Sequence, residues 1–220
     1  MKGVVPSSSP LLERNLKNEP EPGQVARDKQ DLDLLQRVAT KDKLAFESLY
    51  ARYFPQLTRY LIKLMRRPEL VEEVVNDTLY VVWEKAAAFQ GRSKVSTWIT
   101  GIAYLKGIKA LDRLRTMPEQ QAEVLSEAED IEETRNLISR LGLDDWLSNG
   151  LDRISEDQRS VVELTYFSGF SYQEIAEIMD CPVNTVKTRM FHARRRLAKL
   201  LPLLEEQRIA GSEIDEKLID

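Results

Sequence analysis

The sequence predicts an all-α protein in which a flexible acidic linker joins two small helical domains. Apolar residues recur at helical spacing, no stretch alternates polar and apolar residues as a strand does, and an acidic segment with Pro118 and Gly142 interrupts the pattern. This segment holds nine acids against two bases, whereas residues 92–115 hold six bases against one acid. We expect five parts: a disordered leader (1–28), a first domain (29–115), the linker (116–150), a second domain (151–203) and an acidic tail (204–220).

The first domain is predicted to contain four helices. Leucine and aromatic residues at spacings of three and four place two helices within residues 31–64, and Asp42 is positioned to cap the second of them. A third helix is expected at about residues 69–88. A loop of sequence FQGRSKVS leads into a fourth helix at about residues 97–115.

The third predicted helix has two chemically different faces. One face is apolar and would be buried; it consists of Val71, Val74, Val75, Val82 and Ala86. The opposite face is a polar ridge made of Glu73, Asn76, Asp77, Tyr80 and Glu84. Such a ridge is either ordinary solvated surface or a docking site for a basic or polar protein surface.

The loop and the fourth predicted helix mix aromatic with basic residues. This combination is typical of a segment that holds single-stranded nucleic acid, because rings stack on bases while cations follow the backbone. The candidate residues are Phe89, Arg92, Lys94, Ser96, Thr97, Trp98, Lys106, Lys109 and Arg113. Trp98 has a second interpretation as a core residue, since Ile102 and Leu105 share its side of the helix.

The second domain carries two copies of the capping-box spacing. Ser155 with Gln158 and Ser171 with Glu174 each place a hydroxyl three residues before a side chain that can reach back to the cap. They predict helix starts at both serines. Residues 180–182, Asp-Cys-Pro, interrupt the second helix, and a basic helix follows.

The last two predicted helices differ sharply in charge. Residues 181–200 hold six Lys or Arg and no acid, whereas residues 152–180 hold seven acids and two bases. In a helix-turn-helix the second helix lies in the major groove, so we expect the basic helix to contact DNA. Its apolar face is Val186, Met190, Ala193, Leu197 and Leu200. The candidates are Asn184, Lys187, Thr188, Phe191 and His192 for base edges, and Arg194, Arg195, Arg196 and Lys199 for phosphates. The alternative is an amphipathic helix with a solvated basic face.

Composition excludes several other functions. One cysteine, Cys181, cannot form an internal disulfide framework, and with one histidine it leaves too few ligands for a His/Cys metal site. No apolar run approaches the roughly 18 residues of a membrane span. No signal-peptide core, Gly-rich phosphate loop or nucleophile paired with histidine is present. We expect a cytoplasmic protein with no cofactor, no metal, no catalytic residue and no membrane insertion.

Four segments carry a family resemblance: AFESLYARYFPQLTRYL, VEEVVNDTLYVVWEKAAAF, STWITGIAYLKGIKALDRLR and GFSYQEIAEIMDCPVNTVKTRMFHARRRL. Together they resemble bacterial RNA polymerase sigma factors of the sigma-70 family, in the small extracytoplasmic-function group. In order, they resemble the start of the first conserved domain, the core-polymerase-binding segment, the helix that reads and helps open the −10 element, and the helix-turn-helix that reads the −35 element. The resemblance covers roughly residues 31–203.

This resemblance implies a promoter-specificity factor with a region 2 helical bundle and a region 4 helix-turn-helix. It implies that the polar ridge binds the clamp coiled coil of the largest subunit of core RNA polymerase. Promoter DNA would be bound as duplex at −35 and as a single strand at −10, and an anti-sigma factor is a further candidate partner. The −10 helix departs from the family pattern at Leu105 and Lys109, so its base preference cannot be transferred from relatives.

Two other classes of protein stay open at this point. A transcription regulator could carry the same helix-turn-helix behind a helical sensor domain, and it would bind duplex DNA without polymerase. A helical enzyme would need a catalytic constellation, which the sequence does not contain. The order of the segments within residues 71–115 favours the sigma factor.

Overall fold

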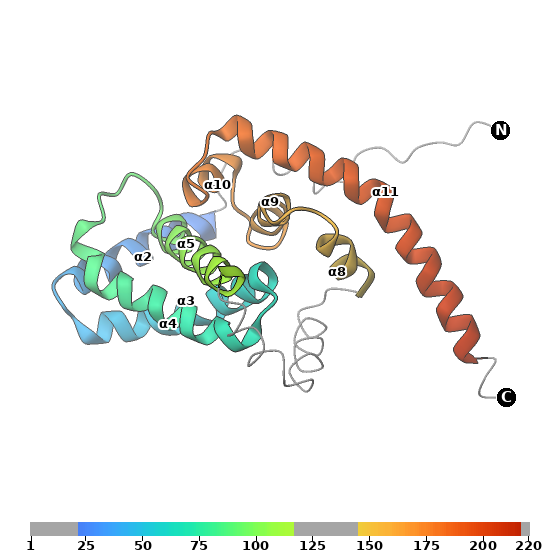
Figure 1. Cartoon of the computed structure of the whole chain (residues 1–220). Helices are drawn as coiled ribbons and strands as arrows, with labels where there is room; N and C mark the ends of the chain where they lie inside the picture. Colours follow the sequence, from blue (N-terminus) through green and yellow to red (C-terminus); the bar gives the residue numbers. More distant parts are fainter. Residues whose placement is uncertain (1–21, 117–144, 217–220) are drawn as a thin grey trace.

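The computed structural model describes residues 22–116 and 145–216, and every regular element in these ranges is a helix (Figure 1). The predicted all-α class is therefore confirmed. The first domain contains α2 (Pro22–Ala39), α3 (Lys43–Met65), α4 (Pro68–Lys85), the short 3₁₀ helix η1 (Ala86–Ala88) and α5 (Val95–Thr116). The second contains α8 (Asp145–Asp152), α9 (Glu156–Tyr166), α10 (Tyr172–Ile178) and α11 (Val183–Glu216).

Helix α2 begins inside the segment that we expected to be a disordered leader. Proline suits the first turn of a helix, where its missing amide has no helical partner to lose. Gln24 then donates a hydrogen bond to the Asp28 carboxylate, with 3.0 Å between Nε2 and Oδ1. Residues 22–28 thus extend the first predicted helix, and residues 1–21 of the predicted leader lie outside the described part of the chain.

Helix α3 forms the centre of the first domain, and its cap is the predicted one. The Asp42 carboxylate accepts a hydrogen bond from the Ala45 amide, 3.1 Å away. That bond and the guanidinium of Arg37 lower the pKa of Asp42. Leucines on the inner face of α3 are fully buried against α2, α4 and α5, among them Leu49, Leu57, Leu61 and Leu64.

One buried polar contact ties α2 to α3. The Tyr53 hydroxyl donates a hydrogen bond to Oδ2 of Asp31, 2.6 Å away, and Arg52 pairs with the other oxygen of the same carboxylate. Burial and the nearby Asp31 carboxylate raise the pKa of Tyr53 far above its ordinary value, so the phenol stays a donor. The contact fixes how α2 lies on α3.

The second domain begins earlier than its predicted boundary at residue 151. Helix α8 occupies residues 145–152, the end of the predicted linker, and Gly150 packs where an added Cβ would lie 2.6 Å from Leu201 Cδ2. Helix α11 also continues through Pro202 to Glu216, into the predicted acidic tail. The rest of the linker, residues 117–144, lies outside the described residues.

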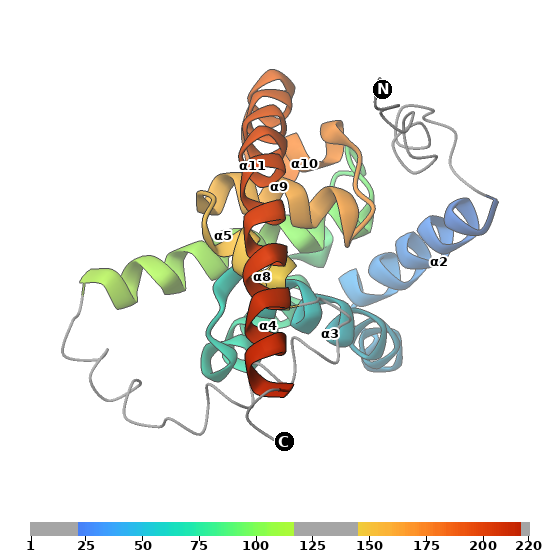
Figure 2. The ribbon, with the colours of Figure 1, turned by 90° about the vertical axis from the view of Figure 1, so that its right-hand side faces the viewer.

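The two domains pack directly against each other, which the sequence did not predict. Helix α5 contacts α10, and α3 contacts α9. In the view turned by 90°, α11 lies across the outer side of the second domain, where it contacts α8, α9 and α10 (Figure 2). Among the described helices, none has a stretch long and apolar enough to cross a membrane.

Candidate functional site

The turn between α10 and α11 has the sharp geometry that the sequence predicted. Ser171 caps α10 with a complete capping box, in which its hydroxyl accepts from the Glu174 amide and the Glu174 carboxylate accepts from the Ser171 amide. Asp180 adopts the left-handed conformation (φ 48°), and the Cys181 amide returns to the Ala176 carbonyl oxygen, 3.0 Å away. The chain then starts α11 at a steep angle to α10.

The apolar and polar faces of α11 divide as predicted. Val186, Met190, Ala193 and Leu197 are buried, and Leu200 is half-buried. The side chains predicted to contact DNA are all exposed; they are Asn184, Lys187, Thr188, Phe191, His192, Arg194 and Arg195. Phe191 is 60% exposed, so its ring is accessible on the polar face of the helix. Its ring meets that of His192 edge-on, with 5.4 Å between centroids.

The basic residues of α11 have two distinct roles. Arg189 turns inward, with Nη2 2.5 Å from the Asp157 Oδ2 and Nη1 3.5 Å from the Cys181 Sγ. It therefore holds α11 to α9 and the turn. Arg194 donates to the Tyr166 hydroxyl on α9 over 2.8 Å, which fixes the direction of that guanidinium. Arg196 and Lys199 are exposed along the same outer face as Arg195.

The loop before α5 brings several predicted single-strand-binding residues together. The rings of Phe89 and Trp98 pack with their centroids 5.3 Å apart, and both are half-buried. Gly91 has a φ of 67°, which lets the loop reverse direction. Arg92 is exposed at this bend, and Lys109 and Arg113 are exposed further along α5. Trp98 thus packs on Phe89 at the edge of the core and is only partly buried.

Thr97 departs from the prediction. It is only 2% exposed, and its hydroxyl is buried without a hydrogen-bond partner among the described residues. The reason is that α5 starts at Val95, so Thr97 falls on the inner face with Thr100 and Tyr104, three and seven residues later. Thr97 therefore supports the packing of α5 and does not face solvent.

Lys94 makes the most consequential contact of this loop. Its Nζ lies 3.0 Å from the Glu174 Oε1 and 3.5 Å from the Asp28 Oδ2. Partial burial would lower the pKa of Lys94, but the two carboxylates outweigh it and raise that pKa. The pKa of Glu174, which burial alone would raise, is lowered by Ser171 and Lys94. A predicted DNA-contacting cation is therefore paired with the helix-turn-helix.

The polar ridge of α4 lies on the exposed face, opposite the buried valines, as predicted. All five members are exposed, namely Glu73, Asn76, Asp77, Tyr80 and Glu84, and Tyr80 is 64% exposed. Asp77 accepts from Lys106 Nζ at 2.7 Å, which joins the ridge to α5, and Glu84 lies 3.3 Å from Lys41 Nζ. The ridge is acidic, and two of its three carboxylates are paired with lysines at its edge.

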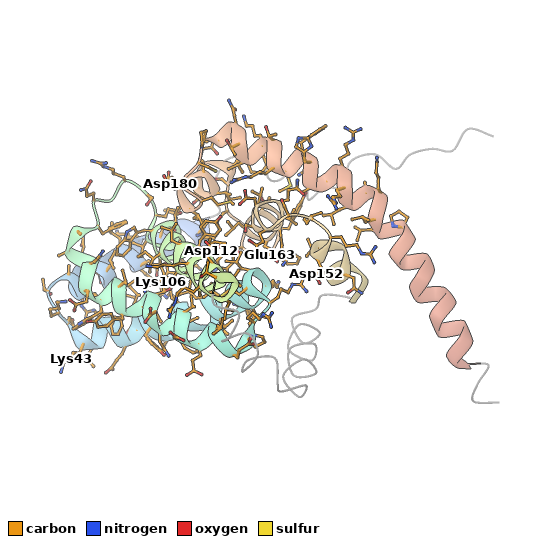
Figure 3. The ribbon with its side chains drawn as sticks, viewed as in Figure 1. Lys43, Lys106, Asp112, Asp152, Glu163 and Asp180 are labelled. Carbon is orange, nitrogen blue, oxygen red and sulfur yellow. The ribbon has the colours of Figure 1, made fainter. Side chains whose placement is uncertain are left out.

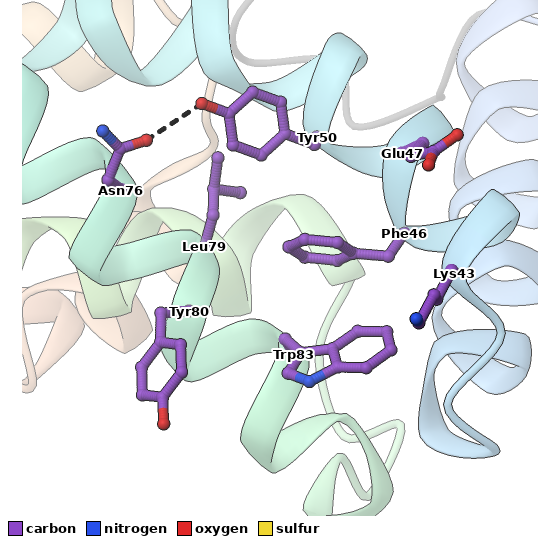
Figure 4. A pocket seen from close by; sticks show the side chains of 8 residues that line it. All are labelled: Lys43, Phe46, Glu47, Tyr50, Asn76, Leu79, Tyr80 and Trp83. Atoms are coloured by element: carbon purple, nitrogen blue, oxygen red, sulfur yellow. Dashed lines mark hydrogen bonds between the residues drawn. The ribbon is translucent and has the colours of Figure 1, made fainter.

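A pocket of about 440 Å³ opens beside this ridge, between α3 and α4 (Figure 4). The rings of Phe46 and Trp83 pack across it with centroids 5.1 Å apart. At its other side the Tyr50 hydroxyl donates to the Asn76 Oδ1 over 2.9 Å. The pocket therefore joins aromatic surface to the polar side chains of the ridge.

Sequence reasoning placed Asn76 and Tyr80 on the ridge but missed the aromatic pocket residues Phe46, Tyr50 and Trp83. Trp83 follows Asn76 by seven residues, two turns of helix, so a helical projection places it at the edge of the ridge. Phe46 and Tyr50 lie on another helix, and no local signal connects them with α4. Within residues 22–116 and 145–216, no group of three or more His, Cys, Asp or Glu could hold a metal ion.

Two family models and several curated proteins match this chain. Residues 49–116 match the family model for sigma-70 region 2, and residues 144–197 match that for sigma-70 region 4. The RNA polymerase sigma-H factor of Pseudomonas aeruginosa is 28% identical over 187 residues, covering 80% of this chain and 97% of that protein. The ECF RNA polymerase sigma-E factor of Haemophilus influenzae is 29% identical over 184 residues, covering 79% and 97%.

Two solved structures of complexes contain a chain of similar fold. CnrH in complex with the cytosolic domain of CnrY matches with a TM-score of 0.60 and 24% identity, over 79% of this chain and 98% of that one. The sigma factor RpoE of Bartonella quintana, bound to the anti-sigma factor NepR, matches with a TM-score of 0.55 and 26% identity, over 71% and 96%.

Proposed function

Since the chain belongs to the extracytoplasmic-function group of sigma-70 RNA polymerase sigma factors, we propose that it divides promoter recognition among three surfaces of named residues. As a promoter-specificity factor, the chain binds core RNA polymerase and promoter DNA and directs the initiation of transcription. The observation that carries the assignment of residues is the exposed polar and basic face of α11, directly after the turn from α10.

The −35 element is read by the first turns of α11. Asn184, Lys187, Thr188, Phe191 and His192 meet base edges in the major groove, because the N-terminal part of a recognition helix enters the groove. Arg194 and Arg195, with Arg196 and Lys199, hold phosphates and set the register. Their exposure along one face supports this division.

The −10 element is held as a single strand by the loop and outer face of α5. Phe89 and Trp98 offer ring surface to unstacked bases, and Arg92, Lys94, Lys109 and Arg113 neutralise the backbone. Opening the duplex costs a few kcal/mol per unstacked base, roughly what one stacked aromatic contact returns. Ser96 and Lys106 border this surface, and buried Thr97 is left out of it.

Core polymerase docks on the ridge of α4. Its carboxylates suit a partner surface with basic and polar side chains, and the adjoining aromatic pocket suits one apolar side chain of the same surface. The partner is the clamp coiled coil of the largest subunit. An anti-sigma factor is a further proposed partner, as the Bartonella quintana sigma factor of similar fold binds one.

Sigma factors are non-catalytic regulatory proteins, and we place no catalytic residue in this chain. Its site of action is proposed to be the cytoplasm, where core polymerase works. Both statements follow from the family and from the chemistry of the three surfaces.

Run-off transcription with purified core polymerase over a promoter library tests the function. The protein should produce specific start sites that core polymerase alone does not produce. A regulator that only carries the helix-turn-helix would bind duplex DNA without producing any such start, and this result would contradict the proposal.

Glu73→Lys tests the docking ridge. Reversing the charge places a like charge against a basic partner surface, so we expect affinity for core polymerase to fall about tenfold or more. Asp33→Lys is the matched control, because Asp33 is exposed on α2 and belongs to neither the ridge nor the pocket. Fluorescence anisotropy with labelled protein measures both affinities. Equal losses in the two variants would contradict the assignment of the ridge.

A further inference from the structure

The contact between the two domains is built from specific side chains of both. An added Cβ on Gly101 of α5 would lie 3.6 Å from the Ile178 Cα at the end of α10. Lys63 Nζ of α3 lies 3.8 Å from the centre of the Phe167 ring, just after α9. Beside them Arg66 Nη1 lies 3.2 Å from the Asp152 Oδ2. Backbone approach, a cation–π contact and an ion pair thus join the same two faces.

This contact covers part of the proposed −10 surface. Lys94, whose cation would follow the DNA backbone, is paired with Glu174 of α10. The −35 and −10 elements are centred about 25 positions apart, roughly 85 Å of duplex at 3.4 Å per step. Because α10 touches α5, one promoter cannot occupy α11 and α5 together in this arrangement. The domains must separate before both surfaces bind DNA.

A buried carboxyl group lies in the centre of the contact. Glu163 on α9 faces the first domain and is 1% exposed, and neither of its carboxylate oxygens has a hydrogen-bond partner among the described residues (Figure 3). From α3 the groups that face it are Tyr60, Lys63 and Arg66; from its own domain they are Asp152 on α8 and Arg159 on α9. The Tyr60 hydroxyl is likewise buried without a partner in the described chain.

Burial raises the pKa of Glu163 to about 8, although Arg159, Arg66 and Lys63 lower it in part. Three of the facing groups belong to the first domain, so separation of the domains exposes the carboxyl to water. In water its pKa returns toward the ordinary 4.5. The carboxyl therefore favours the packed arrangement when it is protonated and opposes it when it is ionised.

We propose that in the free protein α3 and α5 pack against α9 and α10, and that this closed state masks the −10 surface. Glu163 is the titratable group that controls how strongly the domains stay closed, and we call it the latch. Only the identification of the masked surface as the −10 surface rests on the proposed function. The closed state binds one more proton than the open state between pH 4.5 and about 8. Closure is hence strongest below pH 4.5, weakens as the pH rises toward about 8 and changes little above it.

Distance measurement on the full chain tests the latch. Spin labels are placed on Gln56→Cys of α3 and Ala198→Cys of α11, both exposed, in a Cys181→Ser background. We expect one short distance at pH 6 and a second, longer population at pH 9, with the closing equilibrium falling by up to about 100-fold. Glu163→Gln keeps the shape and cannot ionise, so its short distance should persist at both pH values.

Two results would overturn the latch. One is an unchanged distance distribution of the unsubstituted Glu163 protein between pH 6 and pH 9, whether short or long. The other is a pH response of Glu163→Gln equal to that of the Glu163 protein, because the titrating group would then lie elsewhere.

A wedge at the contact tests masking. Gly101→Gln adds a side chain where α10 approaches, while replacing a helical glycine favours α5 itself. We expect the free variant to bind a fluorescent single-stranded oligonucleotide of random sequence several-fold more tightly. Gly23→Gln is the matched control, since no atom lies within 4 Å of its added Cβ. Equal affinities of the two variants would mean that closure does not mask the surface.

Run-off transcription by the unsubstituted protein with core polymerase separates this inference from the proposed function. Specific starts together with pH-independent opening of the Glu163 protein would reject the latch and leave the function standing. A pH-dependent distance without any specific start would reject the function and leave closure standing.

Discussion

Individual side chains on α11 differ in role although they share a charge. Arg189 is bonded to Asp157 inside the domain, whereas Lys187 and Lys199 are exposed on the outer face. Lys187 lies in the second turn of the helix, and Lys199 lies three turns further along. Our proposal assigns base reading to the first position and phosphate binding to the second.

Lys187→Ala and Lys199→Ala test this separation. Loss of Lys187 should cost about 1–3 kcal/mol of −35 binding free energy and relax the base preference at one position. Loss of Lys199 should weaken binding to all DNA sequences evenly and reduce its salt dependence by about one phosphate contact. Binding of the holoenzyme to a −35 library at several salt concentrations measures both effects. The reverse pattern would show that the two faces of α11 have been misassigned.

At the scale of elements, short side-chain caps fix where the helices of the second domain start. Helix α9 begins with a complete capping box, in which the Gln158 amide donates to Ser155 Oγ over 3.3 Å and the Ser155 amide donates to Gln158 Oε1 over 3.4 Å. Helix α9 ends before Gly169, whose φ of 74° favours glycine. These ends set the direction in which α9 presents Glu163 to the first domain.

Ser155→Ala tests how much the cap contributes. Removing the hydroxyl leaves a helix amide without its partner, so the free energy of unfolding should fall by about 1 kcal/mol. Urea unfolding followed by circular dichroism measures it. Ser168→Ala is the control, because Ser168 is exposed and follows the end of α9. A loss in the control as large as that in Ser155→Ala would argue against a specific cap.

At the scale of the whole molecule, two small domains share an interface as well as a chain. Each domain has its own buried core, with Leu61 and Leu79 in the first and Leu164 and Ile175 in the second. The contact between α5 and α10 and that between α3 and α9 couple these cores. Coupled domains unfold together when the contact contributes enough free energy relative to the less stable domain.

Gly101→Gln should uncouple the domains in calorimetry. We expect one thermal transition for the unsubstituted protein at pH 6 and two for Gly101→Gln. The added side chain removes the contact between the domains, while the core of each domain stays intact. Gly23→Gln should keep one transition, as its site is open. Two transitions in all three proteins would show that the contact does not couple the domains.

Much of the candidate site could be predicted from the sequence because its signals are local. The exposed faces of α4 and α11 follow from helical periodicity, and the caps at Asp42, Ser155 and Ser171 follow from side chains three residues from their partners. Thr97 was misplaced because it was assigned to the loop, whereas it lies in the first turn of α5 on the buried face. The pocket of Phe46 and Trp83 needed two helices to be placed together.

The sequence by itself determined the helical class and the exposed faces of α4 and α11, since periodicity, capping and charge act within a few residues of each other. Only the tertiary structure decided that Lys94 faces Glu174 and that Glu163 is buried against Tyr60. These pairs lie far apart in the chain, so their meeting depends on how completed helices pack. A carboxyl group that would otherwise be solvated surface thereby becomes the centre of the contact between the domains.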